Sequence, residues 1–206
     1  MNQLHERGAD VQIPITGYAA AANAASDLVN TSPTVRATTG EALPDPDALA
    51  AFLAGHDLRL DAVAGGRSPS AEDLWEVHLL RREVRGILET ETEEQAVAGA
   101  AVLTGRAALR PVLLRDGDDR WQWHVPTAAG APLADELAAV AGIGLLGTVR
   151  ALGHERFRPC AAPGCRGVFA DVSRSGRRLY CMPDLCGNRL NVANHRARRQ
   201  AGSEAR

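Results

Sequence analysis

The chain has 206 residues, of which 45% are hydrophobic and 23% are charged, a balance that allows a packed core and argues against wholesale disorder. No apolar run reaches the eighteen or so residues of a membrane span, and the first residues lack the apolar segment of a signal peptide. Residues 150–206 hold 12 arginines and four acidic residues, a net +8, whereas residues 1–149 hold 11 arginines and 21 acidic residues, a net −10. We therefore expect a soluble, cytoplasmic protein with an acidic body and a basic appendage, which is typical of nucleic-acid binding.

The acidic body is predicted to be mainly helical. After a loose lead-in over residues 1–16, helices are expected over residues 18–29, 45–55, 70–89 and 92–103. The third is the clearest, because Ser70 and Asp73 have the spacing of a capping box and apolar residues follow at helical intervals. Pro46 after Asp45 marks the start of the second helix, since proline suits the first helical turn.

The hydrophobic period changes after residue 110. Residues 111–114 and 121–125 flank the turn sequence Asp-Gly-Asp-Asp, which predicts a β-hairpin. Residues 132–152 then form a long alanine-rich segment with the pattern of a helix, and it leads directly to the first cysteine. We expect two domains, a helical sensory or assembly domain over 1–152 and a small domain over 153–206, joined by that helix.

All four cysteines lie in two matched pairs, Cys160-x4-Cys165 and Cys181-x4-Cys186. Each pair encloses turn-forming residues, and this spacing predicts a four-thiolate zinc site with one structural metal ion and no open coordination position. The alternatives are a disulfide or redox pair and inert buried cysteines. His154 and His195 flank the cluster and are interpreted as bystanders, because four thiolates complete the tetrahedron.

Two short strands, residues 167–171 and 177–180, are expected between the pairs, and a helix is expected from residue 188 to about residue 200. The order knuckle, β-hairpin, knuckle, helix is that of a treble-clef-like zinc finger. The predicted fold class is therefore mainly α, with a small β-hairpin in the N-terminal domain and this finger at the C-terminus.

The basic residues of the finger are candidate DNA contacts. Arginine and asparagine on a helix can read base edges in the major groove, and arginines on the hairpin are suited to phosphates. The candidates are Arg174, Arg177, Arg178, Arg189, Asn191, His195, Arg196, Arg198 and Arg199. As alternatives, some arginines neutralise the thiolate cluster, the finger binds another protein, or the zinc thiolates act as a redox sensor.

The finger resembles the bacterial CGNR zinc-finger family. The residues that carry the resemblance are Cys181-x4-Cys186-Gly187-Asn188-Arg189, together with Cys160-x4-Cys165 and Phe169-x-Asp171-x-Ser173. The family is regarded as one of stress-induced transcription regulators, which implies DNA as a partner. Tyr180 and Asn191 depart from the family pattern, which often has an indole and a basic residue at these positions.

The body resembles the domain that usually precedes this finger, through Asp27-Leu28-Val29-Asn30-Thr31, residues 49–53 and the helix from Glu72 to Leu88. Such a domain is thought of as sensory, but no ligand follows from the resemblance; if the domain binds a small-molecule effector, the polar candidates for binding it are Asn30, Thr31, Arg81 and Arg85. The alternative is that Asn30 and Thr31 merely end a helix and the arginines face solvent. The sequence contains no catalytic motif, so no enzyme is expected, and a homodimer is compatible with it.

Overall fold

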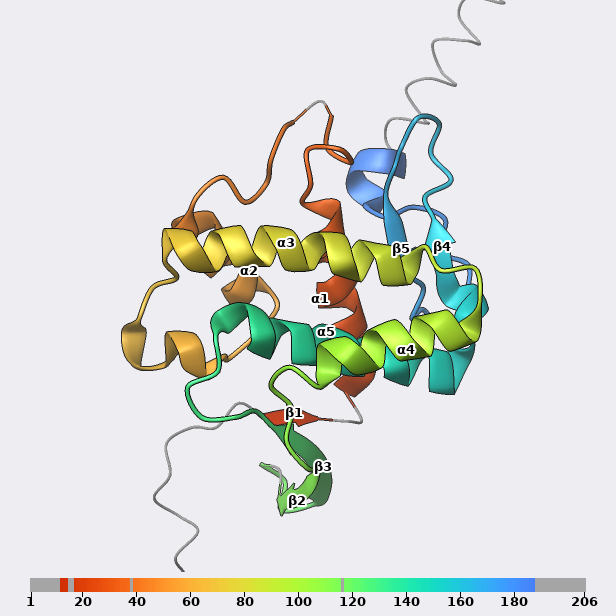
Figure 1. The fold of residues 1–206 in the computed structure, drawn as a ribbon. Helices are drawn as coiled ribbons and strands as arrows, with labels where there is room; N and C mark the ends of the chain where they lie inside the picture. Colours follow the sequence, from red (N-terminus) through yellow and green to blue (C-terminus); the bar gives the residue numbers. More distant parts are fainter. Residues whose placement is uncertain (1–11, 15–16, 38, 116, 188–206) are drawn as a thin grey trace, which may run out of the picture.

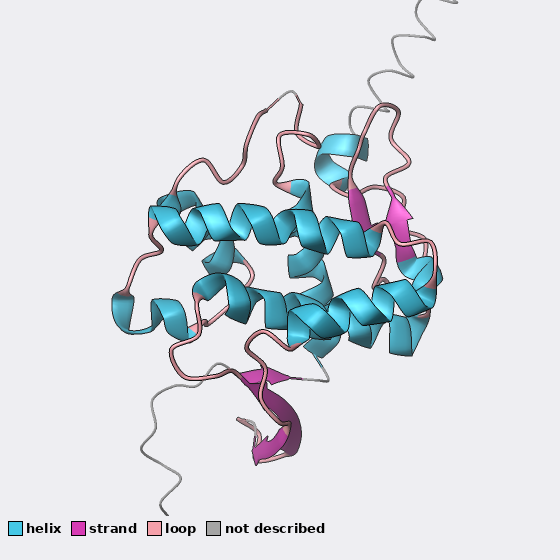
Figure 2. Cartoon of the chain, in the orientation of Figure 1, coloured by secondary structure: helices cyan, strands magenta, loops and turns pink. Residues whose placement is uncertain are grey.

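The computed structural model describes residues 12–14, 17–37, 39–115 and 117–187, and it consists of helices with two small antiparallel sheets (Figure 1, Figure 2). The five α-helices of these residues are α1 (Tyr18–Asn30), α2 (Pro46–Gly55), α3 (Ala71–Leu88), α4 (Glu93–Thr104) and α5 (Leu133–Leu152). Short helical turns follow α2, as η2 (Asp61–Gly66), and α5, as η3 (His154–Arg156). The predicted fold class is confirmed.

The starts of the helices follow from local capping. The Asp45 carboxylate accepts a hydrogen bond from the Ala48 N–H at 2.8 Å, and Ser70 and Asp73 form the predicted capping box at the start of α3. Thr92 caps α4 in the same way. These short-range bonds explain why the predicted helices agree with the observed ones to within one or two residues at most ends.

Helix α5 lies at the centre of the body and packs against α1, α3 and α4. Its residues are buried on nearly all sides, and two glycines allow close approach of the neighbouring backbones. A Cβ atom at Gly144 would overlap the backbone of Ala21 and Ala22 in α1, and one at Gly142 would overlap the Ala100 carbonyl in α4. The core therefore depends on tight contacts along a small-residue helix.

The first sheet has the order β1-β3-β2, with β1 (Gln12–Pro14), β2 (Val112–Arg115) and β3 (Trp121–Pro126). The predicted hairpin is confirmed as β2 and β3, with Leu113 opposite Trp123. The prediction of a loose lead-in over residues 1–16 is wrong at β1, which pairs with β3 in antiparallel register. Three residues ending in a proline are too few to show an alternating pattern, so the sequence holds no local signal for this strand.

The second sheet pairs β4 (Phe157–Pro159) with β5 (Val168–Ala170) in antiparallel register. The predicted strand over 177–180 is wrong, because this segment has no ladder and β5 pairs with β4 instead. Val168 and Ala170 belong to the same buried cluster as α1, α3 and α5, so the start of the cysteine-rich region shares the core of the helical body. Among the described helices, none has the length and apolar content needed to cross a bilayer.

Candidate metal centre

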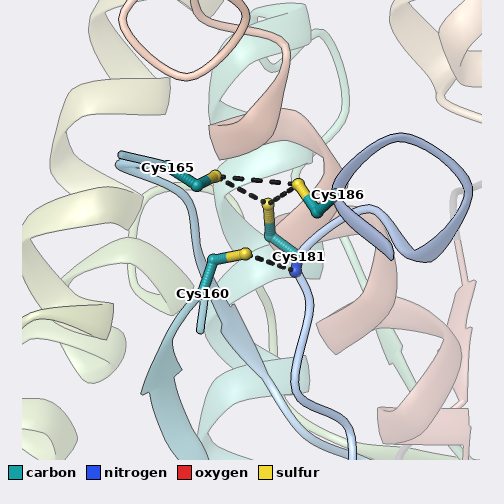
Figure 3. Close-up of side chains that lie close together, drawn as sticks. All are labelled: Cys160, Cys165, Cys181 and Cys186. Atoms are coloured by element: carbon teal, nitrogen blue, oxygen red, sulfur yellow. Dashed lines mark hydrogen bonds between the residues drawn. The ribbon is translucent and has the colours of Figure 1, made fainter. Parts of the chain in front are cut away.

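The four cysteines converge from two chain turns. Cys160 follows β4, and its N–H donates to the Gly167 carbonyl at 2.8 Å, which closes the turn that carries Cys160 and Cys165. Cys181 lies two residues before the short helical turn η4 (Pro183–Gly187) and Cys186 lies within it, where the Cys186 N–H donates to the Met182 carbonyl at 2.8 Å. Figure 3 shows all four sulfur atoms pointing toward one common space.

The sulfur geometry fits one tetrahedral ion. The four Sγ atoms lie within 4.8 Å of one another, and the pairs Cys165–Cys181, Cys165–Cys186 and Cys181–Cys186 are 3.6, 3.7 and 3.7 Å apart. A tetrahedron with zinc–sulfur bonds of about 2.3 Å has edges of about 3.8 Å, close to these three separations. A disulfide needs about 2.05 Å, and all four cysteines are free. The residues present therefore form a structural zinc site.

Burial and mutual repulsion keep two of the thiols protonated when no cation is bound. Burial, followed by the nearby Cys160 and Cys165, raises the pKa of Cys181 strongly, and burial raises the pKa of Cys186 to about 11. Burial also opposes ionisation of Cys160, but N–H groups of Cys181 and Ala162 hold its pKa below the usual value. Zinc must therefore displace protons as it binds, and its affinity falls as the pH falls.

Backbone N–H groups support two of the sulfur ligands. The Gly167 N–H donates to Cys165 Sγ and the Cys181 N–H donates to Cys160 Sγ, both at 3.4 Å. Such bonds stabilise thiolates and orient them toward the metal. His154 bonds instead to the Thr90 hydroxyl at 3.2 Å, in agreement with its interpretation as a bystander, whereas His195 lies outside the described residues.

A buried carboxylate organises the loop between the two cysteine pairs. Asp171 is fully buried and accepts hydrogen bonds from the Ser173 hydroxyl, the backbone N–H groups of Ser173 and Arg178, and the Arg158 guanidinium. Burial alone would raise the pKa of Asp171, but these donors, led by Ser173, hold it below its usual value. Residues 177–180 were predicted to form a strand, but the Arg178 N–H in this segment binds the Asp171 carboxylate and not a neighbouring strand.

Arg178 connects this loop to the metal ligands. Its guanidinium lies 4.6 Å from the centre of the Phe169 ring and donates to the carbonyls of Tyr180 and Cys181. Phe169 is itself fully buried. The spacing Phe169-x-Asp171-x-Ser173 thus has a physical role. It places the Phe169 ring beside the Arg178 guanidinium and the Asp171 carboxylate beside the Arg178 backbone N–H.

Helix α1 covers the second edge of strand β5. The side chain of Asn30 donates to the Val168 carbonyl at 2.8 Å, and the Ala170 N–H donates to the Ser26 hydroxyl at 2.9 Å. These backbone groups point away from β4, so two side chains one helical turn apart take the place of a third strand. Ser26 and Asn30 are buried. Sequence reasoning missed this contact because it joins residues more than 130 positions apart.

Replacing Asn30 with alanine is expected to lower the free energy of unfolding by about 1–3 kcal/mol, because the buried Val168 carbonyl would lose its partner. Zinc affinity should fall as well, since β5 carries the turn that holds Cys165 and Gly167. Urea denaturation and competition with a chromophoric chelator measure the two effects. The control is Asn23→Ala in the same helix; equal losses in both variants would contradict a specific role for Asn30.

The other effector candidates already bind partners in the protein. Arg81 is buried and makes a two-point ion pair with Glu41, at 2.7 and 2.9 Å, and it also donates to the Thr31 hydroxyl at 3.0 Å. Arg85 pairs with Glu89, the residue that follows the last residue of α3. The structure thus brings Thr31 and Arg81 together but not Arg85, and an effector site at these residues stays a prediction.

The predicted DNA contacts fall into two groups. Arg174 and Arg177 are exposed on the loop that Asp171 organises, whereas Arg178 is half-buried under the contacts described above. The remaining candidates lie outside the described residues: Arg189, Asn191, His195, Arg196, Arg198 and Arg199.

Two family models match the chain. The model of the CGNR zinc finger matches residues 156–199, which include all four cysteines. The model named ABATE, with the description "Putative stress-induced transcription regulator", matches residues 22–148, more than half of the chain. A search of curated proteins with the chain found no match.

Proposed function

The chain belongs to the ABATE family of putative stress-induced transcription regulators and carries a CGNR zinc finger, and from this premise we propose that it regulates transcription by binding DNA through the finger. Neither is an enzyme family, and the proposal includes no catalytic step. We further propose that the regulatory domain ends near residue 152, that the finger occupies residues 153–206, and that the protein acts in the bacterial cytoplasm.

The observation that carries the proposal is the coincidence of positive charge with the zinc-stabilised loop. Residues 150–206 have a formal net charge of +8, and Arg174 and Arg177 are exposed on a loop fixed by Asp171. Four thiolates with one Zn²⁺ would reduce this charge by about two, which leaves the finger strongly basic. A phosphate backbone is attracted to such a surface whatever its sequence.

Base recognition is assigned in this proposal to the sequence-predicted helix from residue 188. It follows Gly187 directly, so the second cysteine pair would hold its first residues. Arg189, Arg196 and Arg199 would meet guanine edges or phosphates, and Asn191 would meet adenine. Arg178, whose donors bind carbonyls, would support the loop.

A double change of Arg174→Ala and Arg177→Ala is expected to weaken binding of the zinc-loaded protein to mixed-sequence duplex DNA. Each lost phosphate contact lowers the slope of log K against log salt by about 0.9, so the slope should fall by about two. Fluorescence anisotropy over a salt series measures it. The control is Arg59→Ala with Arg82→Ala, two exposed arginines of the body, which should leave the slope unchanged.

An Arg196→Ala/Arg199→Ala variant separates the helix from the loop in the same assay. Loss of binding in this variant with the loop variant unaffected would assign DNA contact to the helix alone. If the unchanged protein does not bind DNA at low salt, the proposal fails, and the alternative of a finger that binds an acidic protein surface takes its place.

Two further parts of the proposal concern regulation. A small-molecule effector would act on the body, and a ligand anion at Arg81 would have to displace Glu41 from its two-point ion pair. A homodimer would place two fingers on one DNA duplex, as symmetric regulators do with paired half-sites.

A further inference from the structure

The β2–β3 hairpin exposes an unusual amount of apolar surface. Trp121 and Trp123 keep 60% and 49% of their surface accessible, and Leu113 keeps 46%. Leu113 lies directly opposite Trp123 in the ladder, and Trp121 is two residues away on the same strand, so all three share one face of the sheet. Contiguous aromatic and aliphatic surface of this kind is typical of an interaction site.

Contacts hold the hairpin at both of its ends. Val125, on the same face as the tryptophans, is buried in the core, and the Leu109 N–H donates to the Pro126 carbonyl at 2.7 Å. At the outer end the Arg115 guanidinium lies 4.6 Å from the centre of a Trp121 ring. Tryptophan and arginine held in place before binding are the residues that contribute most to protein interfaces.

Strand β2 also offers an open edge. The sheet order β1-β3-β2 leaves one side of β2 without a strand partner among the described residues. Natural sheets usually protect such an edge with charge or proline inside the strand, but in β2, which reads Val-Leu-Leu-Arg, the first three residues are apolar and the one charge is at the last position. An edge with apolar residues is suited to pairing with another strand.

We propose that this hairpin is the homodimer interface, in which β2 of one copy pairs antiparallel with β2 of a second copy. This inference rests on the homodimer in the proposed function and assigns the surface through which the two copies bind. The charges around β2 favour a second copy as the partner. Arg110, exposed, lies two residues before β2. The turn that follows β2 carries Asp118 and Asp119, which form surface ion pairs with Arg120 and Arg115 of the same chain; with three acidic residues and two arginines, residues 115–120 keep a net charge of −1. Antiparallel pairing brings Arg110 of each copy near the acidic turn of the other, so one strand is complementary to itself.

The position of the hairpin agrees with such a dimer. In Figure 1 the hairpin projects from the body at the bottom of the view, whereas β4 and β5 lie at the upper right. Dimerisation there would leave the loop with Arg174 and Arg177 accessible in both copies, so the same particle could present two fingers.

The first test is the mass of the zinc-loaded full chain by sedimentation velocity from about 1 to 100 µM, without DNA. A dimer is expected, and Trp121→Ser with Trp123→Ser should raise its dissociation constant at least about tenfold. The matched control is Trp75→Ser in α3, which is 61% exposed and should leave the mass unchanged. A monomer at every concentration, or equal dissociation by the control, would overturn the proposal.

The second test uses charge and stays informative if the tryptophan variant fails to fold. Arg110→Glu alone and Asp118→Arg alone should each weaken the dimer, because like charges would then face each other. An equimolar mixture of the two variants should form a heterodimer, since the carboxylate introduced at position 110 of one copy would meet the guanidinium introduced into the turn of the other. Failure of the mixture to associate would contradict antiparallel β2 pairing. A dimer retained by all variants would place the interface elsewhere. DNA binding is measured separately, so either proposal can fail alone.

Discussion

Removal of zinc is expected to lower the unfolding temperature of the entire chain. The reason is that Val168 and Ala170, next to the first cysteine pair, are buried together with residues of α1, α3 and α5. Zinc in comparable small fingers contributes an apparent binding free energy of about 10–16 kcal/mol at neutral pH. Losing that free energy would release β5 from α1 and expose part of the shared core. Thermal unfolding followed by far-ultraviolet circular dichroism, with and without a chelator, measures the effect.

A ligand substitution makes the same test without a chelator. Cys186→Ser should lose stoichiometric zinc and unfold the finger, while the body keeps its helical signal but unfolds at a lower temperature. The control, Ala161→Ser, introduces the same hydroxyl at an exposed position inside the first cysteine pair. One zinc ion retained per Cys186→Ser chain would show that the ligand assignment is wrong. An unchanged unfolding temperature of the body in the zinc-free variant would show that the shared core does not make the stability of the body depend on zinc.

The second large effect is expected for Gly167→Ala, which adds a single methyl group. A Cβ atom at this position would overlap Cys181 Sγ and would lie 2.8 Å from Asn30 Oδ1 and 2.9 Å from Cys181 Cβ. Both neighbours are buried, one as a metal ligand and the other as the side chain that holds β5. Overpacking of buried sites costs about 1–3 kcal/mol, so zinc affinity should fall about 5- to 150-fold.

The glycine control separates overlap from the general effect of the added methyl. Gly86→Ala lies within α3 where a Cβ atom meets nothing within 4 Å, and it should be neutral or stabilise the helix by up to about 1 kcal/mol. Chelator competition gives the zinc affinity of both variants. Wild-type affinity in Gly167→Ala would mean that Cys181 and Asn30 can move apart, and the close packing inferred around the metal would then be wrong.

The parts of the fold that the sequence predicts are those with short-range causes. The capping box of Ser70 and Asp73 joins residues three positions apart, and the cysteine pairs have a spacing that zinc coordination requires. Strand partners have no such local cause. β5 pairs with β4, and the Arg178 N–H, in the segment predicted as its partner, binds the Asp171 carboxylate seven residues earlier instead of a strand.

The effector candidates also show that sequence does not reveal partners that lie far apart in the chain. Asn30 and Thr31 follow one another in sequence, yet Asn30 binds strand β5 and Thr31 accepts a bond from Arg81. A polar pair at the end of a helix looks the same in sequence whether it meets solvent, a ligand or a distant strand. Burial distinguishes these cases, and burial is decided by elements far along the chain. The resemblance did point to Asn30, but without its physical role.

The bonds from α1 to β5 also determine when the protein can finish folding during synthesis. Ser26 binds the N–H of a residue 144 positions later, and Asn30 binds a carbonyl 138 positions later. At about 5–20 residues per second, a ribosome needs on the order of ten seconds to make that stretch. Helix α5, which the body is built around, ends at Leu152, so the completed body waits only for residues 153–170, on the order of seconds, before Ser26 and Asn30 gain these partners. Because all four cysteines follow the five α-helices in the chain, the zinc site forms only after the helices of the body have been made, and it then fixes the strand that Ser26 and Asn30 bind.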